Sequence, residues 1–123
     1  MAPGLGLWRS FGLPAVAERF AEAGYAVLLF DFRYHGDSGG EPRGLADPER
    51  QVADYEAAMG AMRESDAVDS GEIVLWGYSF SGGHALSVAA DRFDIAAVIA
   101  TAPFVDGRRE LRRTLRQPKR LLR

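Results

Sequence analysis

The apolar positions of this chain fall into two patterns that alternate along the sequence. Apolar and small side chains recur at helical spacing over residues 14–23, over a segment that starts at Asp47-Pro48, and over residues 84–90. Continuous apolar runs, as expected of strands covered on both faces, occupy residues 25–30 and 73–76, and a third run with β-branched residues occupies residues 93–100. The pattern therefore predicts helix, strand, helix, strand, helix and strand, in that order.

This order is typical of an α/β domain. Strands separated by helices form a parallel sheet with right-handed crossovers, so we expect a three-layer α/β/α arrangement around a parallel sheet. Three strands make a small sheet, and its edges would be open to pairing with another copy of the chain. Self-association through these edges is an expectation of the sequence.

Composition narrows the class of protein. The 123 residues are 47% hydrophobic and suit one domain with one core. Cysteine is absent, so disulfides and thiolate zinc sites are excluded, and a cytoplasmic location is expected. The longest uncharged stretch, residues 73–90, is interrupted by glycines, serines and His84 and does not resemble a membrane span. No metal-ligand spacing or phosphate loop is present, so no cofactor is expected.

Charge divides the chain into two parts. Residues 1–105 carry 7 basic and 15 acidic side chains, a net −8, whereas residues 106–123 carry 8 basic and 2 acidic side chains, a net +6. The arginine-rich segment could bind nucleic acid or an anionic membrane. It lacks aromatic residues, and Pro118 is expected to break its helix. These two features favour the start of a cap or connecting segment. We therefore expect a core over residues 1–105 followed by this segment, with no nucleic-acid partner.

The segment Gly77 to Gly83 (GYSFSGG) joins a predicted strand to a predicted helix and has the pattern of a nucleophile elbow. In such an elbow a strained turn projects the serine hydroxyl, and only small residues fit two positions before and after it. Ser79 is thus the candidate nucleophile. Ser81 stands where the pattern usually has glycine, so the motif reads G-x-S-x-S. The alternative is that Ser79 belongs to an ordinary glycine-rich turn.

Backbone amides near this turn could stabilise an oxyanion. The N–H of Phe80 follows the candidate nucleophile, and the positive end of the next helix adds to its effect. Both features suit nucleophilic attack by a serine on an acyl carbon.

At this point the sequence resembles the α/β-hydrolase superfamily, specifically its dienelactone-hydrolase-like and small serine-peptidase-like bacterial members. The segments that carry the resemblance are GLG (4–6), FAEAGYAVLLFDFR (20–33), HGDSGGEPR (35–43), LWGYSFSGGHAL (75–86) and APFVDG (102–107). The resemblance implies a partial α/β-hydrolase fold, and it implies that the N–H of Leu5 is the second oxyanion donor. It also implies that the chain is part of a longer enzyme, because the triad acid and histidine of that superfamily follow the serine on later loops.

None of the remaining polar residues restores a triad. His35 lies in a loop of the resemblance and His84 points to a different side of its helix from Ser79. Asp106 follows the third predicted strand, where it is either a triad acid or a helix cap. A pair between Asp31 and Arg33 is expected to brace the loop, with turn hydrogen bonds at Asp37 and Ser38.

Two functions follow from these residues. The first is a serine hydrolase in which Ser79 attacks a small-molecule ester or related acyl substrate and Phe80 and Leu5 stabilise the oxyanion. Esters, lactones and peptides all remain possible substrates. The alternative is a catalytically inactive hydrolase-like fragment or interaction module.

Overall fold

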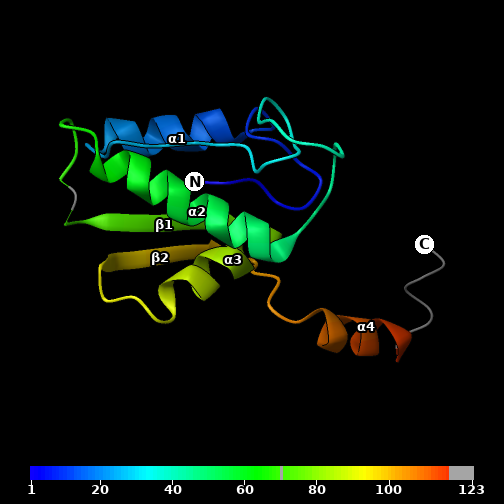
Figure 1. Ribbon diagram of the computed structural model, residues 1–123. Helices are drawn as coiled ribbons and strands as arrows, with labels where there is room; N and C mark the ends of the chain where they lie inside the picture. The colour runs from blue at the N-terminus through cyan, green and yellow to red at the C-terminus, as the bar shows by residue number, and fades with distance from the viewer. Residues whose placement is uncertain (70, 117–123) are drawn as a thin grey trace.

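The structure is a computed structural model that describes residues 1–69 and 71–116. Figure 1 shows helices gathered around a small sheet, with the last helix apart from the rest. The elements in chain order are α1 (Leu13–Glu22), α2 (Pro48–Arg63), β1 (Ile73–Tyr78), α3 (Phe80–Ala89), β2 (Ile95–Thr101) and α4 (Gly107–Leu115). The predicted α/β class is confirmed.

The sheet has two parallel strands joined by the crossover helix α3. β1 pairs with β2 so that Leu75 lies opposite Val98 and Tyr78 opposite Thr101. On its other side, the one described residue that forms a β-bridge with β1 is Ala2, which pairs in parallel with Gly77. The sheet therefore keeps the predicted parallel sense, but the structure assigns it fewer strands than the sequence pattern predicts.

Helices α2 and α3 pack together beside the sheet, and the core lies between them and β1. α2 begins where the sequence predicts, because Asp47 accepts a hydrogen bond from the backbone N–H of Arg50 and Pro48 occupies the first turn. The Tyr55 hydroxyl on α2 donates to the Trp76 carbonyl oxygen on β1 over 2.8 Å. The buried cluster consists of Ala2, Phe32, Tyr55, Met59, Leu75, Ala85 and Val88.

The predicted strand at residues 25–30 is wrong as a strand. These residues run as a nearly straight trace beyond α1 (Figure 1) but have no sheet assignment. A strand is defined by its hydrogen-bonded neighbour, and the neighbour of this segment is short. The Met1 ammonium donates to the Leu28 carbonyl oxygen over 2.7 Å, and the Phe30 N–H donates to the Met1 carbonyl oxygen over 3.2 Å. Among the described residues, Met1 alone therefore makes strand-like hydrogen bonds to the segment.

The other differences lie at element ends. Helix α3 begins at Phe80, directly after Ser79, rather than at residue 84, and β2 begins at Ile95 rather than 93. Helix α4 has no buried residue. Pro118, which was expected to end a helix, lies outside the described residues. No helix in the described part of the chain combines the length and apolar character needed to cross a membrane.

Candidate active site

Ser79 occupies the turn between β1 and α3. Its backbone angles, φ 56° and ψ −114°, lie in a region that L residues rarely adopt. The turn is held on both sides: the Ser79 N–H donates to Thr101 O over 2.9 Å, and the Ser79 carbonyl oxygen accepts from Phe104 N–H over 2.9 Å. The side chain is half-buried, and its hydroxyl has no hydrogen bond to any described residue. The geometry is that of a strained elbow carrying an unengaged hydroxyl.

Two glycines make this turn sterically possible. A Cβ at Gly77 would lie 2.6 Å from the Gly82 nitrogen and closer still to the Ser81 carbonyl oxygen. A Cβ at Gly83 would collide with the Phe104 carbonyl group, with its carbon 3.1 Å away. In both cases the obstacle is backbone, which cannot rotate away, so glycine is required at both positions.

The unusual Ser81 closes the elbow by hydrogen bonding. Its side chain is fully buried, and its Oγ accepts from the Tyr78 N–H over 2.9 Å and donates to the Ala2 carbonyl oxygen over 2.8 Å. A glycine at this position could make neither bond. Ser81 therefore fits the small space that the motif demands and also ties the start of the chain to the elbow.

The loop at residues 4–6 passes beside the candidate nucleophile. A Cβ placed on Gly4 would be 3.6 Å from the Ser79 Cβ and 3.4 Å from the Tyr78 carbonyl oxygen. A turn follows, in which Leu7 N–H donates to Gly4 O over 3.2 Å and Gly6 has φ 70°. Within the described residues, the backbone N–H groups of Leu5 and Phe80 have no hydrogen-bond acceptor. Both N–H groups predicted as oxyanion donors are thus free of a described acceptor. Phe80 directly follows Ser79, and Leu5 lies in the loop that passes beside Ser79.

Neither histidine is hydrogen-bonded to Ser79. His35 donates from Nδ1 to the Arg33 carbonyl oxygen over 3.0 Å, within its own loop. His84 is buried on α3, where its Nε2 lies 2.8 Å from the Gln51 Oε1 on α2 and its ring packs 4.5 Å from the ring of Phe80. Burial lowers the pKa of His84, which favours the neutral form of the ring. His84 is thus a helix residue packed between α2 and α3.

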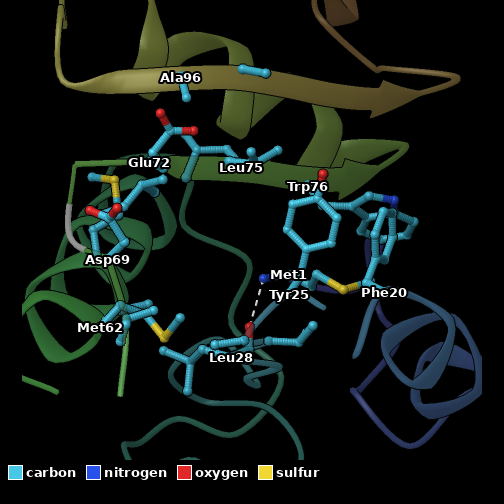
Figure 2. Close-up of a pocket in the computed structure, with 18 of the residues that line it drawn as sticks. Met1, Phe20, Tyr25, Leu28, Met62, Asp69, Glu72, Leu75, Trp76 and Ala96 are labelled. Carbon is cyan, nitrogen blue, oxygen red and sulfur yellow. Dashed lines mark hydrogen bonds between the residues drawn. The ribbon is translucent and has the colours of Figure 1, made fainter. Parts of the chain in front are cut away.

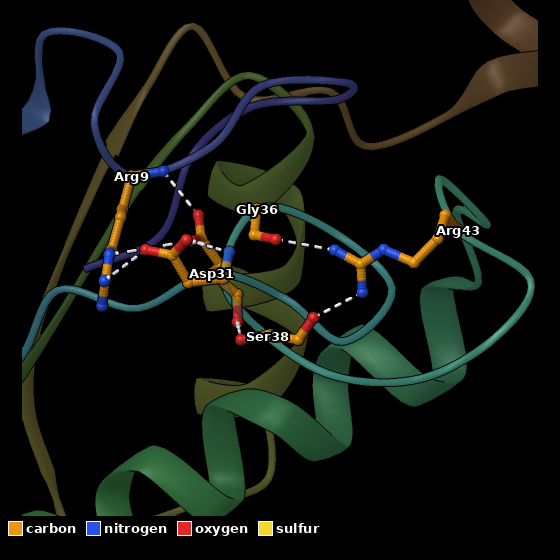
Figure 3. A network of polar contacts seen from close by, with 6 residues as sticks. Arg9, Asp31, Gly36, Ser38 and Arg43 are labelled. Carbon is orange, nitrogen blue, oxygen red and sulfur yellow. Dashed lines mark hydrogen bonds and ion pairs between the residues drawn. The ribbon is translucent and has the colours of Figure 1, made fainter.

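The expected pair between Asp31 and Arg33 does not form. Asp31 is buried and accepts hydrogen bonds from the backbone N–H groups of Arg9 and Asp37, over 2.6 and 3.1 Å (Figure 3). Arg33 instead pairs with Asp54 on α2, over 2.7 Å from Nε to Oδ1. The Asp31 carboxylate is already occupied by two backbone N–H groups and the Arg33 guanidinium by a carboxylate, so each group has another partner. Asp31 and Arg33 still brace the loop, but through residues farther away in the sequence, Arg9 and Asp54.

This polar network holds the loop that follows residues 25–30. The Ser38 hydroxyl donates to the Asp31 carbonyl oxygen over 2.7 Å, as expected of a turn serine, and Arg43 donates to the Gly36 carbonyl oxygen over 2.6 Å (Figure 3). The Asp37 side chain pairs with Arg9 over 2.7 Å instead of bonding within its own turn. These contacts bind the loop to itself and to Arg9, so the role of the network is structural.

Asp106 is a helix cap. Its carboxylate accepts from the N–H groups of Arg108 and Arg109 over 2.9 and 3.0 Å at the start of α4. Within residues 1–69 and 71–116, no three His, Asp or Glu side chains are grouped so as to hold a metal ion. The described site thus consists of a serine, two backbone donors and the loops that position them.

A parallel sheet, a strained serine turn before a helix and a neighbouring glycine loop are the features of an α/β hydrolase. A search of family profiles agrees: residues 9–123 match the family described as serine aminopeptidase, S33. The chain belongs to this family of α/β hydrolases, as the resemblance in the sequence implied.

Curated relatives are similar to this chain over most of the chain's length. The chain is 50% identical over 107 residues to the quorum-quenching protein AidA of Acinetobacter baumannii (strain MDR-ZJ06), covering 87% of this chain and 35% of AidA. It is 37% identical over 106 residues to the thiohydrolase aneE of Aspergillus aculeatus, covering 86% and 33% of the two chains. The chain therefore spans about a third of the length of these relatives.

Solved structures show the same fold. The α/β hydrolase GrgF from Penicillium sp. sh18 superposes with a TM-score of 0.83 at 33% identity, over 98% of this chain and 43% of that one. DcsB, solved with its substrate analogue, superposes with a TM-score of 0.82 at 29% identity, over 99% and 44% of the two chains. A partial α/β-hydrolase fold is confirmed.

Proposed function

We propose that this chain supplies the nucleophile and the oxyanion donors of a serine-dependent acyl-transfer enzyme. The observation that carries the proposal is the backbone of Ser79, at φ 56° and ψ −114°. A conformation of this kind costs about 1–3 kcal/mol and persists only where surrounding contacts enforce it. An ordinary glycine-rich turn would place glycine at such a position, whereas this chain places a serine there.

In the proposed reaction, the Ser79 Oγ attacks the carbonyl carbon of an ester or related acyl substrate. Its proton passes to a general base, and the carbonyl π electrons move onto oxygen. The N–H groups of Phe80 and Leu5 donate to this oxyanion, aided by the N-terminus of α3. The intermediate then expels its leaving group, which takes up the proton, and leaves the acyl group on Ser79. Attack by water completes hydrolysis.

The names of the relatives support acyl chemistry on a small molecule. Besides the thiohydrolase, the chain is 38% identical over 106 residues to the polyketide transferase grgF of Penicillium sp, covering 86% of this chain and 36% of that protein. Hydrolysis and transfer differ only in whether water or another nucleophile attacks the acyl-serine. We therefore propose a small-molecule acyl ester, lactone or thioester as substrate.

The general base is proposed to be a histidine outside these 123 residues. His35 and His84 are both hydrogen-bonded elsewhere, to Arg33 and Gln51. The same observation favours the second candidate, a catalytically inactive hydrolase-like module. The two candidates differ in whether Ser79 can be acylated.

The test is covalent labelling of the purified chain with a fluorophosphonate probe, read by intact mass and peptide mapping. We expect one adduct on Ser79, none in Ser79→Ala, and an unchanged adduct in Ser87→Ala. Ser87 is the matched control because it is an exposed serine on the same helix. We expect the parent chain and Ser87→Ala, but not Ser79→Ala, to turn over p-nitrophenyl acetate. Their rate should be about 10³-fold above the spontaneous rate, as for an enzyme that lacks a triad member. Equal labelling in Ser79→Ala and the parent chain would refute the proposal, and no labelling in any variant would favour the inactive module.

A further inference from the structure

The N–H of Leu5, the proposed second oxyanion donor, lies in a loop over residues 4–11 whose near end is fixed. Met1 donates to the Leu28 carbonyl oxygen over 2.7 Å, the dashed line in Figure 2, and Ala2 pairs in parallel with β1. Burial of the chain ends at residue 4 and resumes only at residue 13. This first anchor therefore stops at the peptide group that carries the Leu5 N–H.

Packing does not fix the rest of the loop. No residue from 5 to 11 is buried, and the side chains of Leu5 and Trp8 are 59% and 49% exposed. The contact nearest to the donor is a turn, in which Leu7 N–H donates to the Gly4 carbonyl oxygen over 3.2 Å. A glycine on one side and an exposed residue on the other leave the peptide group between them free to rotate. The direction of the Leu5 N–H therefore depends on a second anchor beyond this turn.

The second anchor is Arg9. Its backbone N–H donates to the Asp31 Oδ1 over 2.6 Å, and its side chain pairs with Asp37 over 2.7 Å (Figure 3). Apart from turns with near neighbours, every hydrogen bond that joins residues 4–11 to another described segment comes from Arg9. The Asp37 side chain is 82% exposed, so its ion pair contributes little. The far end of the loop is thus held chiefly by one backbone N–H on one buried carboxylate.

The Asp31 carboxylate is itself held in place. Its side chain is only 2% exposed, and the next residue, Phe32, belongs to the core. Its Oδ2 accepts from the Asp37 N–H over 3.1 Å, and a Cβ on Gly36 would lie 2.8 Å from its Oδ1. An ionised acceptor makes stronger hydrogen bonds than a neutral one. The carboxylate is therefore a fixed and strong acceptor for the Arg9 N–H.

The partners of Asp31 exclude a direct part in the chemistry and go beyond a brace for its own loop. Within the described residues, the carboxylate contacts Arg9 and the Asp37 N–H, and both histidines are hydrogen-bonded elsewhere. A brace for its own loop would need the Asp37 bond alone. The bond to Arg9 instead spans 22 positions of the chain. The structural network of Figure 3 thus reaches the loop beside Ser79.

We propose that Asp31 is a positioning residue of the oxyanion site: its carboxylate fixes Arg9, and the turn between Gly4 and Leu7 carries this constraint to the Leu5 N–H. The inference rests on the proposed function, in which that N–H donates to the oxyanion. A donor must lie about 2.7–3.1 Å from the oxyanion, and a misplacement of about 1 Å costs up to about 10²-fold in rate. Loss of this anchor should therefore slow the reaction and leave the nucleophile intact.

The test compares Asp31→Asn with Asp54→Asn in the full chain. An asparagine has one acceptor oxygen, whereas Asp31 accepts two N–H groups. Asp54 is the matched control, because its carboxylate also accepts a backbone N–H and pairs with an arginine, both of Arg33, yet has no described bond to residues 4–11. Arg9→Pro is the second variant. It removes the same N–H from the exposed loop and leaves the carboxylate in place, so the test stands even where Asp31→Asn does not fold.

We expect kcat for p-nitrophenyl acetate to fall about 10–100-fold in Asp31→Asn and Arg9→Pro, with KM unchanged, because the oxyanion forms only in the transition state. Asp54→Asn should keep the kcat of the parent chain. The second measurement is amide hydrogen exchange at Leu7, which reports the turn beside Leu5. This exchange should quicken about tenfold in Asp31→Asn and Arg9→Pro, but not in Asp54→Asn.

The outcomes separate this inference from the proposed function. Equal kcat in Asp31→Asn and Asp54→Asn, or equal exchange at Leu7 in the two chains, would overturn the inference alone. A loss of kcat that merely matches the unfolded fraction of Asp31→Asn, measured by urea unfolding, would also overturn it. A parent chain that neither labels at Ser79 nor turns over the ester would refute the proposed function instead. Exchange at Leu7 would then still decide whether Asp31 holds the loop.

Discussion

Replacing Ser81 with alanine should lower the free energy of unfolding by about 1.5–5.5 kcal/mol. The Ser81 hydroxyl is fully buried and joins two backbone groups, the Tyr78 N–H at 2.9 Å and the Ala2 carbonyl oxygen at 2.8 Å. Removing the hydroxyl leaves one donor and one acceptor without a partner, at about 1–3 kcal/mol each. The better helix propensity of alanine returns roughly 0.5 kcal/mol. The net loss is therefore a large share of the stability of a small domain.

The assay is urea unfolding followed by tryptophan fluorescence, since Trp76 lies on β1 beside the elbow. Ser87→Ala is the matched control, because the Ser87 hydroxyl bonds only to the Gly83 carbonyl oxygen of its own helix and is exposed. We expect the control to change stability by less than about 0.5 kcal/mol. Identical unfolding midpoints for the two variants would refute the reasoning that Ser81 holds Ala2 and Tyr78 together.

Three further results are expected. Gly77→Ala should destabilise the fold by about 1–3 kcal/mol, because its Cβ would meet the backbone of Gly82 at 2.6 Å. Gly60→Ala on α2, with open space around it, should instead stabilise the fold by roughly 0.5–1 kcal/mol in the same denaturation assay. Burial lowers the pKa of His84 in the folded chain, so the unfolded chain binds the proton first and the free energy of unfolding should fall as pH drops below about 6.5. His84→Gln should flatten this dependence in unfolding curves at pH 7.5 and 5.5. An equal change between the two pH values in both proteins would contradict it. The outer edge of β2 has no partner in the described chain, so the parent should associate with rising concentration in sedimentation velocity and Ile99→Lys should reduce this association; a monomeric parent would exclude it.

The local features of the fold could be predicted from the sequence. Asp47-Pro48 starts α2 because a side-chain cap and a fixed proline φ act within one turn. The elbow at Ser79 was equally predictable, since a glycine two positions before the serine and small residues after it answer a steric demand within a few residues. Such signals depend only on neighbours along the chain, which a single sequence displays.

The remaining features depend on distant partners. Residues 25–30 have the composition of a buried strand, but pairing decides the assignment, and in the described part of the chain Met1 alone makes strand-like hydrogen bonds to them. Arg33 takes Asp54, 21 positions away, in place of Asp31, and Ser81 bonds to Ala2 across 79 positions. Nothing in a charged or hydroxylated side chain identifies which distant group will face it. The serine in place of glycine at position 81 was the one signal in the sequence, because a buried hydroxyl needs a hydrogen-bond partner.

Ala2 connects the start of the chain to the candidate active site. Its backbone bridges Gly77, the glycine that permits the elbow, and its carbonyl oxygen accepts the Ser81 hydrogen bond. Two positions later, Gly4 lies against Ser79, and Leu5 follows with its unengaged N–H. The Ser81 hydrogen bond thus fixes Ala2, and through Ala2 the loop that presents this N–H. Under the proposed function, Ser81→Ala should therefore label at Ser79 more slowly than Ser87→Ala, because a less ordered donor stabilises the developing negative charge less well.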